Sequence, residues 1–375
     1  MRALALVFLK LGTIAFGGPA AHIAMMEDEV VRRRAWLTRE EFLDYLGATN
    51  LIPGPNSTEL AIHVGYARAG WLGLIVAGAA FILPAAFIVG AIAWGYVRFG
   101  SLPAVAGLLY GIKPVVIAIV LQALIGLAKT ALKSAWLIVL AVACIVAAAV
   151  GVNELGILAG AVVIALSLRT LAFSKPADGR IGEGLLAPLL LQAGGVGTAA
   201  AIPVSLVPLL GVFLKIGSVL FGSGYVLLAF LRSDLVERLH WLTERQLLDA
   251  VAVGQMTPGP VFTTATFIGY VLHGASGAAV ATIGIFLPAF VFVAISGKLI
   301  PAMRRSPTAR AVLDAVNVAS LALMAVVTAQ LARAAVVDLT TLGLAVLAAI
   351  LLLHWKVNSA WLVLGGAVVG LAARA

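Results

Sequence analysis

Two Pro-Gly-Pro triplets, at residues 53–55 and 258–260, interrupt stretches that are otherwise apolar enough to cross a membrane. Proline removes a backbone donor and clashes with the preceding turn, and glycine adds backbone freedom, so a helix cannot continue through such a triplet. Within the hydrocarbon, unpaired backbone groups survive only where protein or a water-filled cavity satisfies them. The sequence therefore predicts a membrane helix that breaks at depth, and does so twice.

Composition supports the membrane assignment. The 375 residues are 62% hydrophobic and 11% charged, with a mean hydropathy of +1.11, which excludes a soluble globular domain. Several apolar runs reach the ~20 residues that a transmembrane helix needs, a pattern unlike the short alternating segments of an outer-membrane barrel. Residues 3–9 are apolar but Lys10 ends the run, so we expect a mature helix there rather than a signal peptide. The predicted fold class is an all-α polytopic membrane protein.

Charge and cysteine content limit the kinds of partner that the protein is expected to bind. The formal charge of +9 is expected to reflect basic loops that set membrane orientation, and no nucleic-acid partner is expected. The one cysteine, Cys144, excludes a disulfide framework and a thiolate metal cluster within the chain. We expect no metal and no cofactor.

The chain is a duplication of one unit. The segment FLKLGTIAFGG at residues 8–18 recurs as FLKIGSVLFGS at 213–223, and WLTREEFLD at 36–44 recurs as WLTERQLLD at 241–249. These pairs, and the two Pro-Gly-Pro triplets, share one offset. We predict an N-terminal repeat over residues 1–172, a linker over 173–203 that is rich in small residues and proline, and a C-terminal repeat over 204–375.

Each half is predicted to contain a lysine-bearing first helix, a polar amphipathic segment, a broken hydrophobic segment and four plain helices. In the first half the broken segment covers residues 43–67, in two pieces of about 9–12 residues that each reach half of the ~30 Å core. We therefore expect a re-entrant hairpin and about five crossing helices in each repeat. This arrangement places about two loop cations on one face for each one on the other, a sharper split than full crossings give, so the positive-inside rule predicts inverted repeats.

Paired breaks at matching positions of two repeats indicate a transport site at the membrane midplane. A helix that restarts after each break presents free N–H groups, which favour an anion. The alternative is that the triplets only kink the helices for packing. The predicted substrate-binding residues at the breaks are Pro53, Gly54, Pro55, Asn56, Ser57, Thr58, Pro258, Gly259, Pro260 and Thr263.

Lys10 and Lys215 lie inside the first helix of each repeat, with no acid nearby in the same helix. Intramembrane lysines are costly, and two related by a pseudo-twofold axis could bind one dianion. The alternative is that each lysine extends to the headgroups. The loops that follow add Gly17, Gly18, Gly222 and Ser223 as substrate-binding candidates, although glycine at a tight helix end explains them almost as well.

Other polar residues are candidates for coupling. Glu59 and His63 share one face of the helix after the first break and are predicted to relay protons, unless they only form a polar wall facing the cavity. Lys113, beside Pro114, is expected to stabilise a kink more readily than to line a pathway. Asp44 and Asp249 are expected to cap helices or to pair with the basic amphipathic segments.

The ordered double set of FGGP at residues 16–19, FGSGY at 221–225, WLT and Pro-Gly-Pro resembles the chromate transporter (CHR) family in its long, two-domain form. The resemblance covers nearly the whole chain. It implies efflux of chromate across the bacterial inner membrane, chromate resistance, and proton-motive-force coupling, with sulfate as a competing ligand. Ser223 stands where the first copy has Gly18, so the second loop departs from the pattern.

Three rival functions are weighed against a chromate exporter. A sulfate or other oxyanion importer and an anion channel would use the same fold. An intramembrane enzyme is not expected, because the sequence has no His-Glu-x-x-His, Gly-x-Ser-x-Gly or phosphate-binding Gly-x-x-x-x-Gly-Lys loop. The expected partners are chromate or sulfate, protons and the lipid bilayer, and the oligomeric state stays open with a homodimer as one alternative.

Overall fold

The computed structural model describes residues 1–16, 18–100, 102–173, 203–221 and 226–374, which form helices and no strands. The helices of the first half are α1 (Arg2–Ile14), α2 (Gly18–Glu27), η1 (Asp28–Arg33), α3 (Arg39–Thr49), α4 (Asn56–Phe99), α5 (Pro103–Ala131), α6 (Ala135–Ala149) and α7 (Glu154–Phe173). Those of the second half are α8 (Leu206–Val219), α9 (Leu227–Leu231), η2 (Arg232–Arg238), α10 (Glu244–Met256), η3 (Val261–Thr263), α11 (Thr264–Arg305), α12 (Pro307–Ala335), α13 (Leu339–Leu353) and α14 (Ser359–Arg374).

The predicted helix breaks are present at both Pro-Gly-Pro triplets. In the first half α3 ends at Thr49 and α4 begins at Asn56. In the second half α10 ends at Met256, and the single turn η3 leads into α11. Gly54 and Gly259 adopt φ angles of 141° and 85°, which a residue with a side chain rarely adopts, so the central glycine of each triplet is needed for the turn.

The helix after each break soon reverses direction. Non-helical backbone at Ala69 and Gly70 divides α4, and at His273 and Gly274 it divides α11. Gly65 packs against the carbonyl group of Gly73 across the first reversal, so the two pieces of α4 lie antiparallel in close contact. Each half therefore contains a short helix, a break, a second short helix, and then a helix long enough to span a bilayer.

The recurring WLT sequence starts the short helix before each break. Thr38 accepts a hydrogen bond from the backbone N–H of Glu41, whose side chain accepts one from the N–H of Thr38. Thr243 and Gln246 form the same reciprocal capping box at the start of α10. Such a cap satisfies two N–H groups that the helix cannot and contributes about 1 kcal/mol.

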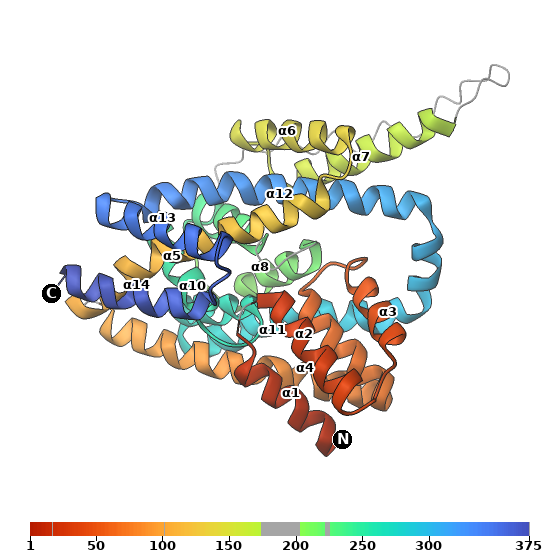
Figure 1. Ribbon diagram of the computed structural model, residues 1–375, viewed down its shortest axis with the longest axis horizontal. Coiled ribbons are helices and arrows are strands. Elements are labelled where there is room, and N and C mark those ends of the chain that lie inside the picture. Colours follow the sequence, from red (N-terminus) through yellow and green to blue (C-terminus); the bar gives the residue numbers. More distant parts are fainter. Residues whose placement is uncertain (17, 101, 174–202, 222–225, 375) are drawn as a thin grey trace.

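Helices from each half cover a long helix of the other. Helices α13 and α14 pack against α5, while α6 and α7 pack against α12 (Figure 1). Small residues bring α5 and α14 close: Gly111 lies against the backbone of Gly366 and Gly370. Close approach through small residues is the usual basis of helix association in a membrane, where water does not drive it.

At the centre, α4 packs on α11 and each break is hydrogen-bonded to the other half. The N–H of Gly54 donates to the carbonyl oxygen of Leu220, at 2.7 Å, just after the end of α8. The N–H of Gly259 donates to the carbonyl oxygen of Ala15, at 2.9 Å, just after the end of α1. The two breaks are thus anchored by reciprocal bonds between the halves.

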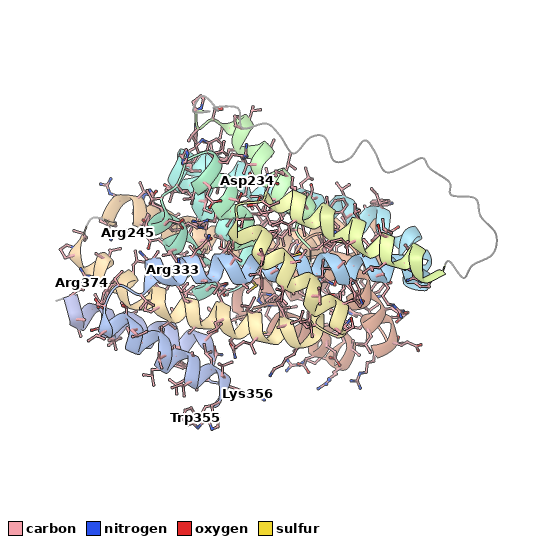
Figure 2. The ribbon with its side chains drawn as sticks, turned by 90° about the horizontal axis from the view of Figure 1, so that it is seen from above. Asp234, Arg245, Arg333, Trp355, Lys356 and Arg374 are labelled. Atoms are coloured by element: carbon pink, nitrogen blue, oxygen red, sulfur yellow. The ribbon has the colours of Figure 1, made fainter. Side chains whose placement is uncertain are left out.

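The chain is a multi-pass membrane protein. Four described helical segments are long and apolar enough to cross a bilayer: Asn56–Phe99, Pro103–Ala131, Val261–Ser296 and Pro307–Ala335. Shorter apolar helices accompany them: Ala135–Ala149, Leu206–Val219, Leu339–Leu353 and Ser359–Arg374. Figure 2 shows Arg245, Arg333 and Arg374 towards the same end of the molecule, with Lys356 before the start of α14 and Arg374 at its end.

Candidate functional site

A cavity of about 590 Å³ with charged and apolar lining residues lies beside the first break. Its wall combines the end of α3, the end of α5, the segments around α8 and α9, and the first half of α12. The lining residues are Gly47, Asn50, Leu51, Leu127, Thr130, Ala131, Lys133, Phe221, Val226, Arg310, Leu313, Asp314, Asn317, Ser320 and Leu321. Both halves contribute, so a movement of one half against the other would change the shape of this cavity.

Two cations and one acid line the cavity. Lys133, in the turn between α5 and α6, lies 3.4 Å from the carboxylate of Asp314 on α12. Arg310, one turn earlier on α12, is exposed and forms no ion pair with any side chain that the structure describes. The cavity therefore carries a net positive charge, which favours an anion over a cation.

One buried polar atom in the cavity wall has no partner among the described residues. Ser320 is 1% exposed and lines the cavity, and its hydroxyl oxygen has no hydrogen-bond partner among the described residues. Asn50 accepts a hydrogen bond from the amide of Asn56, at 2.8 Å, which ties the cavity wall to the start of α4. A buried hydroxyl without a partner costs free energy, so it indicates a place where water or a ligand binds.

The interface at the equivalent sequence positions of the other half is closed. There α10 packs on α5, and the ammonium group of Lys113 lies 2.7 Å from the carboxylate of Asp249. The hydroxyl of Tyr96 donates to the second oxygen of Asp249 at 2.8 Å. Asp249 is 1% exposed, so the pair is shielded from water.

Two expectations from the sequence are corrected by this contact. Asp249 was expected to cap a helix or to pair with the amphipathic segment, but it lies inside α10 and binds Lys113. Thr243 is the residue that caps α10. Lys113 was expected mainly to stabilise a kink at Pro114, but it joins α5 to α10 because a buried ammonium group needs a carboxylate.

None of the described residues predicted to bind substrate lines this cavity. The N–H groups of Gly54 and Gly259 bond to backbone of the opposite half. Thr263 donates its hydroxyl to the carbonyl oxygen of Pro260. Gly18 starts α2, whereas the predicted Gly17, Gly222 and Ser223 lie outside the described residues. The substrate-binding role of the breaks stays a prediction.

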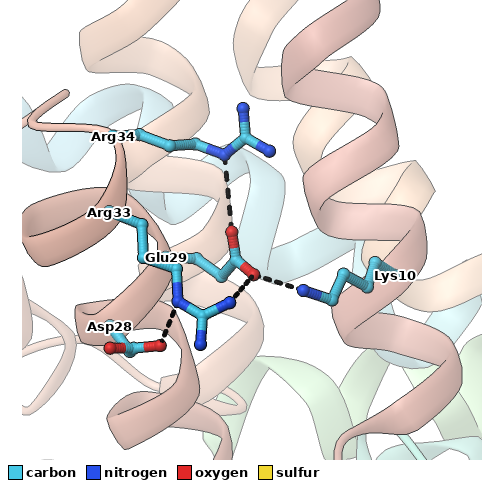
Figure 3. A network of polar contacts seen from close by, with 5 residues as sticks. All are labelled: Lys10, Asp28, Glu29, Arg33 and Arg34. Atoms are coloured by element: carbon cyan, nitrogen blue, oxygen red, sulfur yellow. Dashed lines mark hydrogen bonds and ion pairs between the residues drawn. The ribbon is translucent and has the colours of Figure 1, made fainter.

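Lys10 and Lys215 each bind an acid from the segment that follows α2 or α9. Lys10 forms an ion pair with Glu29, which also contacts Arg33 and Arg34 (Figure 3). The hydrogen bond from Lys10 lowers the pKa of the Glu29 carboxyl group below its ordinary value.

Lys215 lies 2.8 Å from Asp234, which also pairs with Arg238. Glu29 and Asp234 are 5% and 2% exposed, so both carboxylates are buried against their partners. In this conformation the charge of each lysine is already neutralised.

Glu59 and His63 lie on the helix just after the first break. Glu59 is fully buried, and neither carboxylate oxygen has a partner among the described residues. His63 is 4% exposed and stacks on Tyr45, with ring centroids 5.4 Å apart. The two predicted coupling residues are therefore both buried in the first half, next to the break.

A second buried histidine, His22, lies beside a contact between the two halves. Its Nε2 atom lies 3.1 Å from the carbonyl oxygen of Ala15, the atom that also accepts from Gly259. A carbonyl oxygen only accepts, so Nε2 carries the proton, and in the neutral ring Nδ1 accepts from the hydroxyl of Ser57 at 3.3 Å. The predicted site residue Ser57 thus orients a histidine.

Several residues of this region were not predicted from the sequence. Glu29 and Asp234 share the spacing of Lys10 and Lys215, so the duplication itself was a signal that could have identified them. Lys133, Arg310 and Asp314 carry no such signal, because only the packing of α12 brings them together. Ser320 is a single small polar residue within the largely apolar helix α12, so no sequence pattern marks it.

Comparisons with known proteins agree with the resemblance. The family described as "Chromate transporter" matches residues 2–166 and again residues 207–371. A "Chromate transport protein" of Cupriavidus metallidurans is 32% identical over 100% of this chain and 93% of its own length. A "Probable chromate transport protein" of Synechococcus elongatus is 32% identical over 94% of this chain and 89% of its own. A "Chromate transport protein" of Pseudomonas aeruginosa is 32% identical over 93% of this chain and 86% of its own length.

No solved structure matches this chain. The family match covers both halves of the sequence separately, and the similarity to the relatives runs over nearly its full length. The chain therefore belongs to the chromate transporter family.

Proposed function

We propose that this protein is a secondary active transporter that exports chromate across the bacterial inner membrane, driven by the proton motive force, and confers chromate resistance. One observation carries the proposal: a cavity with a net positive charge is open between α3 and α12, whereas the equivalent interface between α10 and α5 is closed by Lys113 and Asp249. An open and a closed version of one interface within a duplicated chain is what alternating access requires.

The orientation of the cavity fits export. If the repeats are inverted, the loops around Lys133 and Arg310 belong to the more positive face, which is cytoplasmic by the positive-inside rule. The conformation described here then opens to the cytoplasm, where an exporter takes up its cargo. The outward-open state would break the pair between Lys113 and Asp249 and close α3 on α12.

The paired breaks and lysines form the inner part of the proposed site. A tetrahedral dianion needs several donors and two compensating charges, which the restarting helices and the ammonium groups of Lys10 and Lys215 can supply. Both lysines are bound to acids here. Binding of chromate at this inner site therefore requires each lysine to exchange its carboxylate for the cargo.

Proton coupling is assigned to Glu59, with His63 one turn further along α4. A fully buried carboxyl group without a partner is favoured when it is protonated and disfavoured when it is charged. Its access to water is expected to alternate with that of the cargo.

The test is uptake of labelled chromate into proteoliposomes, with and without an imposed pH gradient and with sulfate as competitor. Gradient-dependent accumulation that falls in Lys10→Ala and Lys215→Ala supports a proton-coupled transporter with the paired inner site. Flux that only equilibrates points to an anion channel. Accumulation of sulfate in the opposite direction points to an oxyanion importer, and no flux of either ion contradicts the proposal.

A further inference from the structure

We propose that the cavity between α3 and α12 is itself an oxyanion-binding site, in which Lys133 and Arg310 bind the cargo and Asp314 competes with it for Lys133. This inference rests on the proposed function, because it names where a tetrahedral dianion is first bound. It differs from the paired site at the breaks, whose residues do not line the cavity.

Charge selects the ligand class. Lys133 and Arg310 bring two positive charges to the cavity, and Asp314 brings one negative charge. A dianion that displaces Asp314 from Lys133 would meet two cations. A guanidinium group binds tetrahedral oxyanions through two parallel hydrogen bonds, so Arg310 is suited to the cargo without an exchange of partner.

Neutral donors complete the site. The amide groups of Asn50 and Asn317 and the hydroxyl group of Ser320 line the same cavity. Ser320 is 1% exposed and its oxygen lacks a partner among the described residues, so this hydroxyl group is free to bind a ligand. The site therefore offers both charge and oriented donors, as an oxyanion requires.

The size of the cavity indicates how the ion binds. A volume of about 590 Å³ is within the range of small-molecule sites and far larger than a single tetrahedral oxyanion. The ion is expected to enter with part of its hydration shell. Direct contacts to the two cations and water-mediated contacts to the amide groups follow from that size.

Asp314 gives the site a distinctive signature. In this structure Asp314 lies 3.4 Å from the ammonium group of Lys133, and the cargo must displace it. Removing Lys133 should therefore weaken oxyanion binding, whereas neutralising Asp314 should strengthen it. If the ion pair only supported the fold, both substitutions would act in the same direction.

The experiment measures binding of sulfate and of chromate by isothermal titration calorimetry on the full-length protein in detergent. The variants are Lys133→Gln, Arg310→Gln and Asp314→Asn. Lys129→Gln is the matched control, because Lys129 is exposed on α5 and does not line the cavity. Elution as a single peak on size exclusion, together with the thermal unfolding midpoint, shows that each variant folds.

We expect the Kd to rise about tenfold or more in Lys133→Gln and Arg310→Gln, to fall about threefold in Asp314→Asn, and to stay unchanged in Lys129→Gln. Unchanged affinity in all variants, with chromate flux intact in the wild type, overturns this site and leaves the transport function standing. A wild type that neither binds nor moves an oxyanion overturns both. A rise of Kd in Asp314→Asn equal to that in Lys133→Gln assigns the pair to structure and also overturns the site.

Discussion

The cavity between α3 and α12 and the contact between α10 and α5 are two versions of one interface. Lys113 and Asn317 occupy equivalent positions on α5 and α12, and Asp249 and Asp44 occupy equivalent positions on α10 and α3. In one version a lysine and an aspartate join the helices at 2.7 Å. In the other an asparagine replaces the lysine, and a cavity of about 590 Å³ lies at the interface.

The difference between the two interfaces shows that duplication preserves local structure but not the contacts between helices. Both halves keep the break, the anchoring bonds of Gly54 and Gly259, and the capping boxes, because these depend on local sequence that is present twice. The two interfaces differ because Lys113, whose equivalent is Asn317, is present only once. A duplicated scaffold can therefore contain two unequal interfaces, as this one does.

The largest effect is expected from Lys113→Met, which leaves Asp249 buried without its cation. Removing one partner of a buried ion pair costs about 3–5 kcal/mol, and the hydroxyl of Tyr96 compensates only in part. The midpoint of thermal unfolding in detergent should fall markedly. Asn317→Met, at the equivalent position of the open interface, should change it little.

A double variant separates charge from shape. Lys113→Met combined with Asp249→Asn removes both charges and should recover most of the lost stability, because no unpaired charge is then buried. If the double variant is as unstable as the single one, the closed interface depends on packing, and the comparison between the two interfaces loses its electrostatic basis.

A smaller loss of stability is expected from Gly259→Ala, which tests the helix break that both halves share. The φ of 85° disfavours any side chain, and an added Cβ would lie 2.6 Å from the Cβ of Ala85 and 3.0 Å from the carbonyl oxygen of Gly12. Strain and crowding together should cost about 1–3 kcal/mol in unfolding free energy. The midpoint of thermal unfolding in detergent measures this loss, and chromate transport is assayed in parallel.

Gly70→Ala is the matched control for that variant. Its φ is 58°, but an added Cβ would meet nothing within 4 Å, so only the backbone strain remains. A larger loss in Gly259→Ala than in Gly70→Ala assigns the difference to contact between the halves. Equal losses would mean that the break is not tightly packed against the other half.

Features that depend on local sequence could be predicted, whereas contacts between distant elements could not. Proline and glycine act on the local backbone, so the breaks at Pro53 and Pro258 were predicted correctly, and the doubled short motifs identified the family. Ion pairs join elements far apart in the sequence. The partner of Lys113 was therefore missed, and Asp249 was assigned to the wrong role. The cavity residues were missed because no local pattern marks them.

Glu59→Gln tests an asymmetry next to the breaks. Glu59 is fully buried after the first break, and the corresponding residue after the second is Thr264. Glutamine keeps the size but cannot exchange a proton, so chromate accumulation under an imposed pH gradient should fall about tenfold, to simple equilibration, while binding persists. Thr264→Val should leave the gradient dependence intact. If chromate accumulation in Glu59→Gln still depends fully on the pH gradient, another residue couples transport to protons.

The smallest effect is expected from Ser320→Ala in the cavity wall. Val116 occupies the equivalent position of the closed interface and is 1% exposed, so an apolar side chain is tolerated there. Because the hydroxyl of Ser320 has no partner in the protein, its loss should leave the unfolding free energy unchanged or slightly higher. Oxyanion affinity should fall about threefold, the contribution of one neutral hydrogen bond.

Ser218→Ala is the control for that substitution, because the hydroxyl of Ser218 bonds to the carbonyl oxygen of Leu214 and does not line the cavity. It should leave the affinity for sulfate and chromate unchanged when both are measured by calorimetry. A drop in stability without a change in affinity in Ser320→Ala would show that this hydroxyl supports the helix rather than the ligand. The open interface would then differ from the closed one in its charged residues alone.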